Sequence, residues 1–121
     1  MTGIRLIQRA EAHGQATAIS GGGNSYSYAD LLQASARIGT ALLDGADDLR
    51  EDRVAFLIPG SFEYVAVQWA SWRAGGVAVP LSILGAEPEL EHILTDAAVG
   101  VLVAPRPLQG RMEPLCRRLG I

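Results

Sequence analysis

Lysine is absent from this sequence, and all ten cationic side chains are arginines. Apart from the pair Arg117 and Arg118, the arginines are scattered along the chain. A nucleic-acid-binding surface needs a concentrated basic patch or stripe. The net charge of −3 also argues against such a surface, and no basic stripe with interleaved aromatic residues occurs. We therefore expect no nucleic-acid partner.

Cysteine and long apolar runs are also scarce. The single cysteine, Cys116, cannot form an internal disulfide and has no metal-ligand spacing around it, which indicates a reducing compartment. No apolar run approaches the roughly 20 residues that span a bilayer. Arg5 and Arg9 are followed by Glu11 and not by an apolar core, so no signal peptide is expected. The prediction is a cytoplasmic protein without a membrane span, and the amphipathic, arginine-containing start leaves the mitochondrial matrix as the alternative.

The chain is rich in apolar residues, at 49% against 19% charged over 121 residues, which predicts one globular unit. Its first part predicts a short helix that ends near Gly14, a strand over 17–20 and a return strand over 25–28. Between these strands, residues 21–24 (Gly-Gly-Gly-Asn) permit the positive φ angles of a reversal.

A longer helix is expected after this hairpin. Ser27 and Asp30 have the spacing of a capping box, and Gly45 is placed to follow the helix end. The residues expected on its inner face are Leu31, Ser35, Ile38 and Leu42. A charged loop then covers 47–52.

The rest of the chain alternates strands and helices. Apolar strands are expected over 54–58, 77–79 and 99–104, the first of them buried on both faces. Pro88 and Pro107 suit first helical turns, and Gly120 suits a helix end. The helices show apolar stripes at Phe62, Val65, Trp69 and Trp72, at Leu90, Ile93, Leu94 and Ala97, and at Leu108, Met112, Leu115 and Leu119.

This order predicts an α/β fold: an N-terminal hairpin and helix, followed by a βαβαβα parallel, doubly wound sheet. Ile121 stands where a further strand would begin. We therefore expect the sheet to be incomplete and to be part of a larger domain.

Two glycine clusters invite a phosphate-loop interpretation, and both fit simpler roles better. The cluster at 21–24 joins two short strands and no lysine follows it, so a hairpin turn is favoured. Gly75 and Gly76 lie between a helix and a strand, the reverse of a dinucleotide fingerprint, and indicate a helix end with close packing.

Three other candidate sites carry weak signals. Pro59-Gly60-Ser61 follows a strand and precedes a helix, where ligands bind in open α/β sheets, although Ser61 can simply cap the helix. His13 lies near a helix end, and His92 has carboxylates at i−3 and i+4, a spacing that a solvent-facing charged helix also explains.

Trp69 and Trp72 could stack on a base, but their helical spacing favours burial against the sheet. Cys116 shares a helix with Leu115 and Leu119 and has no basic partner, so a structural role is favoured over a nucleophile. Composition and spacing therefore indicate a parallel α/β module and assign no reaction.

Several stretches, in order, resemble the acyl-activating family of AMP-forming acyl-CoA synthetases, aryl-CoA ligases, luciferases and adenylation domains. They are residues 26–32 (Tyr-Ser-Tyr-Ala-Asp-Leu-Leu), 53–59, 63–72, 74–81 (Ala-Gly-Gly-Val-Ala-Val-Pro-Leu), 89–96 and 101–104. Residues 68–72 with 79–81 are most similar to the malonyl-CoA and methylmalonyl-CoA synthetase branch. Residues 83–86 (Ile-Leu-Gly-Ala) depart from the histidine and proline that related members often carry there.

The resemblance implies that residues 1–121 are the N-terminal portion of the large AMP-binding domain, without a complete second domain. The complete enzyme would activate a carboxylic acid with ATP and Mg²⁺ and transfer the acyl group to CoA. The family's Ser/Thr/Gly-rich loop and its lysine have no counterpart here. No catalytic, cofactor-binding or metal-binding residue is therefore assigned.

Two hypotheses follow. The first is an N-terminal fragment of an acyl-CoA ligase that is inactive alone and partners the remainder of the ligase in cis or in trans. The alternative is a free-standing α/β binding or assembly module without turnover. A sheet with an unpaired edge also predicts self-association of the isolated chain.

Overall fold

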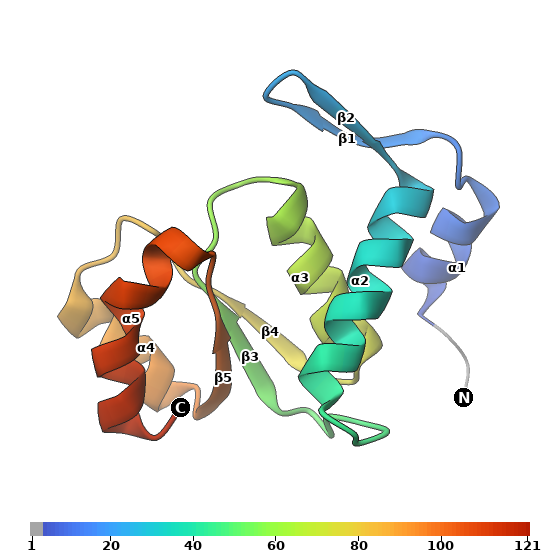
Figure 1. The fold of residues 1–121 in the computed structure, drawn as a ribbon. Coiled ribbons are helices and arrows are strands. Elements are labelled where there is room, and N and C mark those ends of the chain that lie inside the picture. The colour runs from blue at the N-terminus through green and yellow to red at the C-terminus, as the bar shows by residue number, and fades with distance from the viewer. Residues whose placement is uncertain (1–3) are drawn as a thin grey trace.

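The structure is a computed structural model that describes residues 4–121. Its first half contains helix α1, the antiparallel hairpin β1–β2 and helix α2 (Figure 1). These elements span Arg5–Ala12, Thr17–Gly21, Asn24–Ser27 and Tyr28–Leu43. The second half alternates strands and helices: β3 Arg53–Phe56, α3 Phe62–Arg73, β4 Val77–Pro80, α4 Glu87–Asp96, β5 Val99–Val103 and α5 Arg106–Leu119.

The second half forms a parallel, doubly wound sheet. Its strand order is β4-β3-β5, and β3 pairs in parallel with both neighbours. Helices α4 and α5 cover one face, and α3 with α2 lies on the other (Figure 1). The predicted α/β architecture is therefore confirmed, with five helices and a three-stranded parallel sheet among residues 4–121.

The central strand β3 accounts for the continuous apolar run in the sequence. Every residue from Val54 to Ile58 is buried, because helices cover both faces of the strand that has a neighbour on each side. Regular pairing ends at Phe56, two residues earlier than predicted. Leu57 still donates its backbone N–H to the Val103 carbonyl at 2.9 Å, so the chain stays in the sheet's layer.

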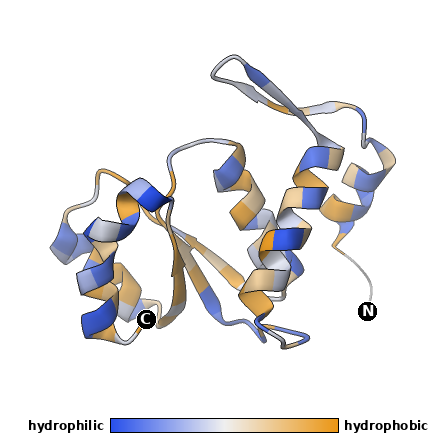
Figure 2. Ribbon diagram, in the orientation of Figure 1, coloured by the Kyte–Doolittle hydropathy of each residue, from blue (hydrophilic) through white to orange (hydrophobic). Residues whose placement is uncertain are grey.

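Each face of the sheet has its own apolar core. Toward α4 and α5, Ala55 and Leu57 pack in one cluster with buried leucines and a methionine: Leu81, Leu90, Leu94, Met112 and Leu115. Toward α3, Phe56, Ile58 and Val67 form another cluster. Figure 2 shows β4 and β5 largely in hydrophobic colours, whereas hydrophilic residues collect on the outer side of α5.

Local signals set the hairpin and helix ends as predicted. Gly22 and Gly23 have φ angles of 60° and 82°, both positive, as a type I′ turn requires. Ser27 Oγ accepts the Asp30 backbone N–H at 3.1 Å, and Asp30 Oδ2 accepts the Ser27 N–H at 2.9 Å. This is the predicted capping box at the start of α2. Gly120 ends α5 in the left-handed region.

The pair Gly75-Gly76 is a helix end and a point of close packing. Gly75 has a φ of 87°, and its carbonyl accepts the Glu51 N–H at 2.8 Å. A Cβ at Gly76 would lie 2.9 Å from Leu49 Cδ1 and 3.0 Å from the Asp52 carbonyl oxygen. The loop before β3 therefore runs directly against the turn after α3, as the interpretation of this motif predicted.

Neither tryptophan belongs to the apolar clusters of the parallel sheet, which corrects the prediction that both pack against it. Trp69 is buried, at 6% exposure, in a third cluster formed with Ile7 and Ala10 of α1 and Leu31 of α2. Trp72 is 37% exposed. Helix α3 lies between the sheet on one side and helices α1 and α2 on the other. Its apolar residues therefore divide between two layers, and its apolar stripe reaches the surface at Trp72.

No helix within residues 4–121 combines the length and the apolar character that crossing a membrane requires.

Candidate functional site

The sheet changes winding direction between β3 and β5. The chain leaves β3 toward α3 on one face and leaves β5 toward α5 on the opposite face (Figure 1). Loops that diverge in this way leave a crevice at the carboxyl ends of the strands, which is where ligands bind in open α/β folds. This position is the natural candidate for a ligand site in the described part of the chain.

A cavity of about 520 Å³ lies there, which we call the carboxyl-edge groove. Residues after all three strands line it: Ile58, Pro59, Ser61 and Glu63 after β3, Ile83 after β4, and Pro105, Pro107 and Leu108 after β5. The lining is mainly apolar, with one hydroxyl and one carboxylate. Such a groove suits an apolar group of a small ligand more than a polyanion.

The loop after β3 is held by Ser61. Its Oγ donates to the Pro59 carbonyl at 2.8 Å and accepts the Tyr64 backbone N–H at 3.2 Å. The hydroxyl proton is therefore already engaged within the loop, and the side chain caps α3. The motif Pro59-Gly60-Ser61 does border the groove, as its place after a strand predicted, but the Ser61 side chain acts there as a cap.

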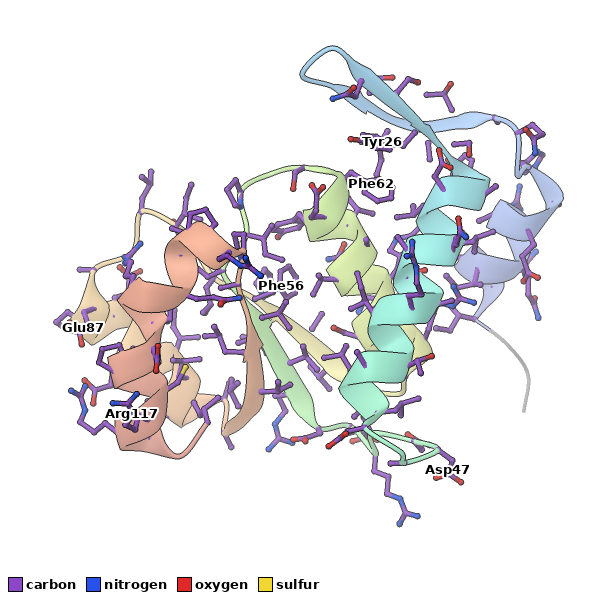
Figure 3. All side chains as sticks on the ribbon, in the orientation of Figure 1. Tyr26, Asp47, Phe56, Phe62, Glu87 and Arg117 are labelled. Atoms are coloured by element: carbon purple, nitrogen blue, oxygen red, sulfur yellow. The ribbon has the colours of Figure 1, made fainter. Side chains whose placement is uncertain are left out.

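The same loop borders a second cavity, of about 480 Å³, on its other side. This one lies between the hairpin tip at Gly21 and Gly22 and the start of α3. Tyr26 and Phe62 lie against each other there, with ring centroids 4.2 Å apart and planes at 29° (Figure 3). The stacked pair joins the hairpin to α3, which supports the hairpin role predicted for the glycine cluster.

The remaining sequence candidates lie elsewhere. His13 and His92 are both exposed, the first after α1 and the second on α4, away from the groove. Cys116 packs beside the α4–α5 core, and burial raises the pKa of its thiol above the ordinary value. A raised pKa keeps the sulfur protonated near neutral pH, which fits the structural role favoured from the sequence.

Arg111 is the residue that sequence reasoning missed. Its guanidinium donates to the Ile83 carbonyl at 2.8 Å and also to the Gly85 carbonyl. These partners are 28 and 26 residues away in sequence, and no local pattern links an arginine on one helix to carbonyl groups of a distant loop. Only the βαβ topology brings them together.

The groove does not fit a nucleoside triphosphate. Among the described residues that line it, the charged one is Glu63, whose carboxylate repels phosphate, and none is a cation. Within residues 4–121, no group of three or more histidine, cysteine, aspartate or glutamate side chains is placed to hold a metal ion.

Comparison with known proteins identifies the family. The model of the AMP-binding enzyme family matches residues 6–118. The chain belongs to the AMP-binding enzyme family. Human (Homo sapiens) mitochondrial malonate–CoA ligase ACSF3 is 36% identical over 120 residues, which is 96% of this chain and 21% of that protein. Feruloyl-CoA synthase of an Amycolatopsis species is 37% identical over 97 residues, 80% of this chain and 20% of that protein.

Solved structures agree with the family assignment. The crystal structure of apo MatB from Rhodopseudomonas palustris superposes with a TM-score of 0.78 at 28% identity, covering 95% of this chain and 24% of MatB. The chain spans about a fifth of the length of its curated AMP-binding relatives. The stretches that carried the resemblance lie at the start of α2, in α3 and α4, and in all three strands of the parallel sheet. The family-like residues therefore build the sheet and contribute to one wall of the groove.

Proposed function

We propose that residues 1–121 form the N-terminal portion of the large domain of an ATP-dependent acyl-CoA ligase. In this proposal the complete enzyme joins a carboxylic acid to ATP, giving an acyl-adenylate and pyrophosphate, and CoA then displaces AMP to form the thioester. The observation that carries the proposal is the match of the AMP-binding family over residues 6–118, on a sheet with a groove at its switch point.

In the reaction, this chain serves as a structural scaffold and shapes a ligand-binding surface. Charge on the phosphates must be compensated during adenylation, and donors or cations placed at the developing charge supply most of that stabilisation. The chain has no lysine, and the carboxyl-edge groove has no lining cation. The remainder of the ligase therefore supplies those groups, either in the same polypeptide or as a separate one.

Malonate is the first substrate to test, because the human relative at 36% identity is named a malonate–CoA ligase. Ferulate is the second. A feruloyl-CoA synthase is 37% identical over a shorter stretch, and the apolar groove suits an aromatic ring better than a small dianion. The compartment proposed is the cytoplasm, with the mitochondrial matrix the alternative that the human relative's name supports.

The decisive experiment is carboxylate-dependent ATP–pyrophosphate exchange. The full-length gene product is assayed with malonate, ferulate and no acid, beside the 121-residue chain alone. We expect exchange with one of the acids in the full-length protein and none above background in the isolated chain. Exchange by the isolated chain would refute the division of roles proposed above.

The alternative is a free-standing α/β binding or assembly module without turnover. A full-length gene product that binds nucleotide or acid in calorimetry, yet supports no exchange with any acid, would favour that alternative over the ligase.

A further inference from the structure

The β4–α4 loop carries apolar side chains on the protein surface. Ile83 and Leu84 are exposed, Leu84 at 89%. The loop is a tight turn in which Gly85 N–H donates to the Ser82 carbonyl at 3.0 Å and Leu84 N–H to Ser82 Oγ at 3.2 Å. These local bonds shape the turn but do not fix it against the rest of the molecule.

Arg111 supplies the long-range attachment. One guanidinium nitrogen donates to Ile83 O at 2.8 Å and the other to Gly85 O. Among residues 4–121, the ion pairs involve Arg117 and Arg118 and not Arg111, so its fork is directed to backbone carbonyl groups alone. A planar guanidinium makes two such bonds in a fixed geometry, which an ammonium cannot reproduce.

The attachment spans the carboxyl-edge groove. Leu108 lines the groove from α5. It precedes Arg111 by three residues and so lies on the same side of that helix. Ile83 lines the groove from the β4–α4 loop. The backbone carbonyl of Ile83 is the group that Arg111 holds. Arg111 therefore connects the loop wall of the groove to its helix wall.

We propose that Arg111 is a positioning residue of the carboxyl-edge groove, which fixes Ile83 in the wall so that the groove accepts the apolar group of an organic acid. This inference rests on the proposed function for the identity of the ligand. The carboxylate of that acid points away from Glu63, because two like charges in an apolar groove repel. Arg111 acts through the loop and does not touch the ligand.

The test compares three variants of the full-length gene product. Arg111→Met keeps much of the aliphatic stem and removes both donors, and Arg111→Lys keeps the charge without the fork. Arg117→Met is the matched control, because Arg117 lies on the same helix and makes only an exposed ion pair with Glu113 at 2.7 Å. Hydrogen–deuterium exchange of 82–86 and calorimetric binding of ferulate without ATP are the readouts.

We expect about tenfold faster exchange at 82–86 in Arg111→Met, from the loss of two hydrogen bonds, with exchange in β3 unchanged. Ferulate binding should weaken by about three- to tenfold in Arg111→Met, less in Arg111→Lys, and not in Arg117→Met. Unchanged loop exchange, unchanged ferulate affinity in Arg111→Met, or a parent that binds no ferulate would each overturn the inference.

The outcomes separate this inference from the ligase proposal. If the parent shows no carboxylate-dependent ATP–pyrophosphate exchange but loses loop protection and ferulate affinity in Arg111→Met, the ligase proposal fails and the positioning role stands. If the parent is a ligase and hydrogen exchange at 82–86 is unchanged in Arg111→Met, the positioning role alone fails. If Arg111→Met also loses protection from hydrogen exchange in β3, that variant is unfolded. Loop exchange and ferulate affinity in Arg111→Lys then decide whether the positioning role stands.

Discussion

At the scale of single residues, the glycines differ in how closely other atoms approach them. At Gly76 an added Cβ would lie 2.9 Å from Leu49 Cδ1 and 3.0 Å from the Asp52 carbonyl oxygen, whereas at Gly110 it would meet nothing within 4 Å. Gly110 lies inside helix α5, where alanine is the better helix former.

We therefore predict opposite effects of the same substitution at these two sites. Gly76→Ala should lower the free energy of unfolding by about 1–3 kcal/mol through overpacking. Gly110→Ala should raise it by about 0.5–1 kcal/mol. Urea denaturation followed by circular dichroism measures both. Equal midpoints for Gly76→Ala and the parent would contradict the packing described for the turn after α3.

Cys116 gives a prediction about pH. Burial raises the pKa of its thiol in the folded chain above the unfolded value, so the folded form holds its proton more tightly. Stability from this group is complete below the unfolded pKa and declines as the pH rises toward and through the folded pKa. Iodoacetamide should therefore modify Cys116 in the folded chain more slowly at pH 8 than in the urea-unfolded chain. Equal rates would show an accessible, unperturbed thiol.

At the scale of elements, serine side chains cap the starts of α2 and α3. Ser27→Ala removes the acceptor of the Asp30 N–H at the start of α2, and we expect a loss of about 1 kcal/mol in the free energy of unfolding. Ser25→Ala is the control, because Ser25 is an exposed residue of β2. The double variant Ser27→Ala/Asp30→Ala should lose less than the sum of the single variants, since the two residues form one box. Strict additivity would argue that the box does not act as a unit.

The elements themselves were predictable because their signals are local. Capping residues, prolines in first turns, glycine helix ends and apolar stripes act over a few residues, and they placed α2, α4 and α5 correctly. Trp69 and Trp72 were misplaced because helical spacing alone does not reveal that α3 has layers on both sides. The groove was foreseen only as an edge position after β3, and Arg111 could not be foreseen because its partners come from another loop.

On the scale of the whole molecule, the sheet ends in two strands that are paired on one side only. Among the described residues, β4 and β5 flank β3 in the order β4-β3-β5, so each has a free edge. Unpaired backbone N–H and C=O groups along a strand can pair with another chain. Val77 at the start of β4 is also 43% exposed, which adds apolar surface to that edge.

We predict that the isolated 121-residue chain self-associates through the β4 edge. Its sedimentation coefficient should rise with concentration over about a hundredfold range, and Val77→Lys should suppress the rise because a charged edge residue disfavours strand pairing. Leu84→Lys is the matched control, since it places the same charge on an exposed apolar residue of the β4–α4 loop, outside the strand. Suppression by Leu84→Lys alone would assign association to the loop, and a monomer at every concentration would show that neither edge recruits a second chain.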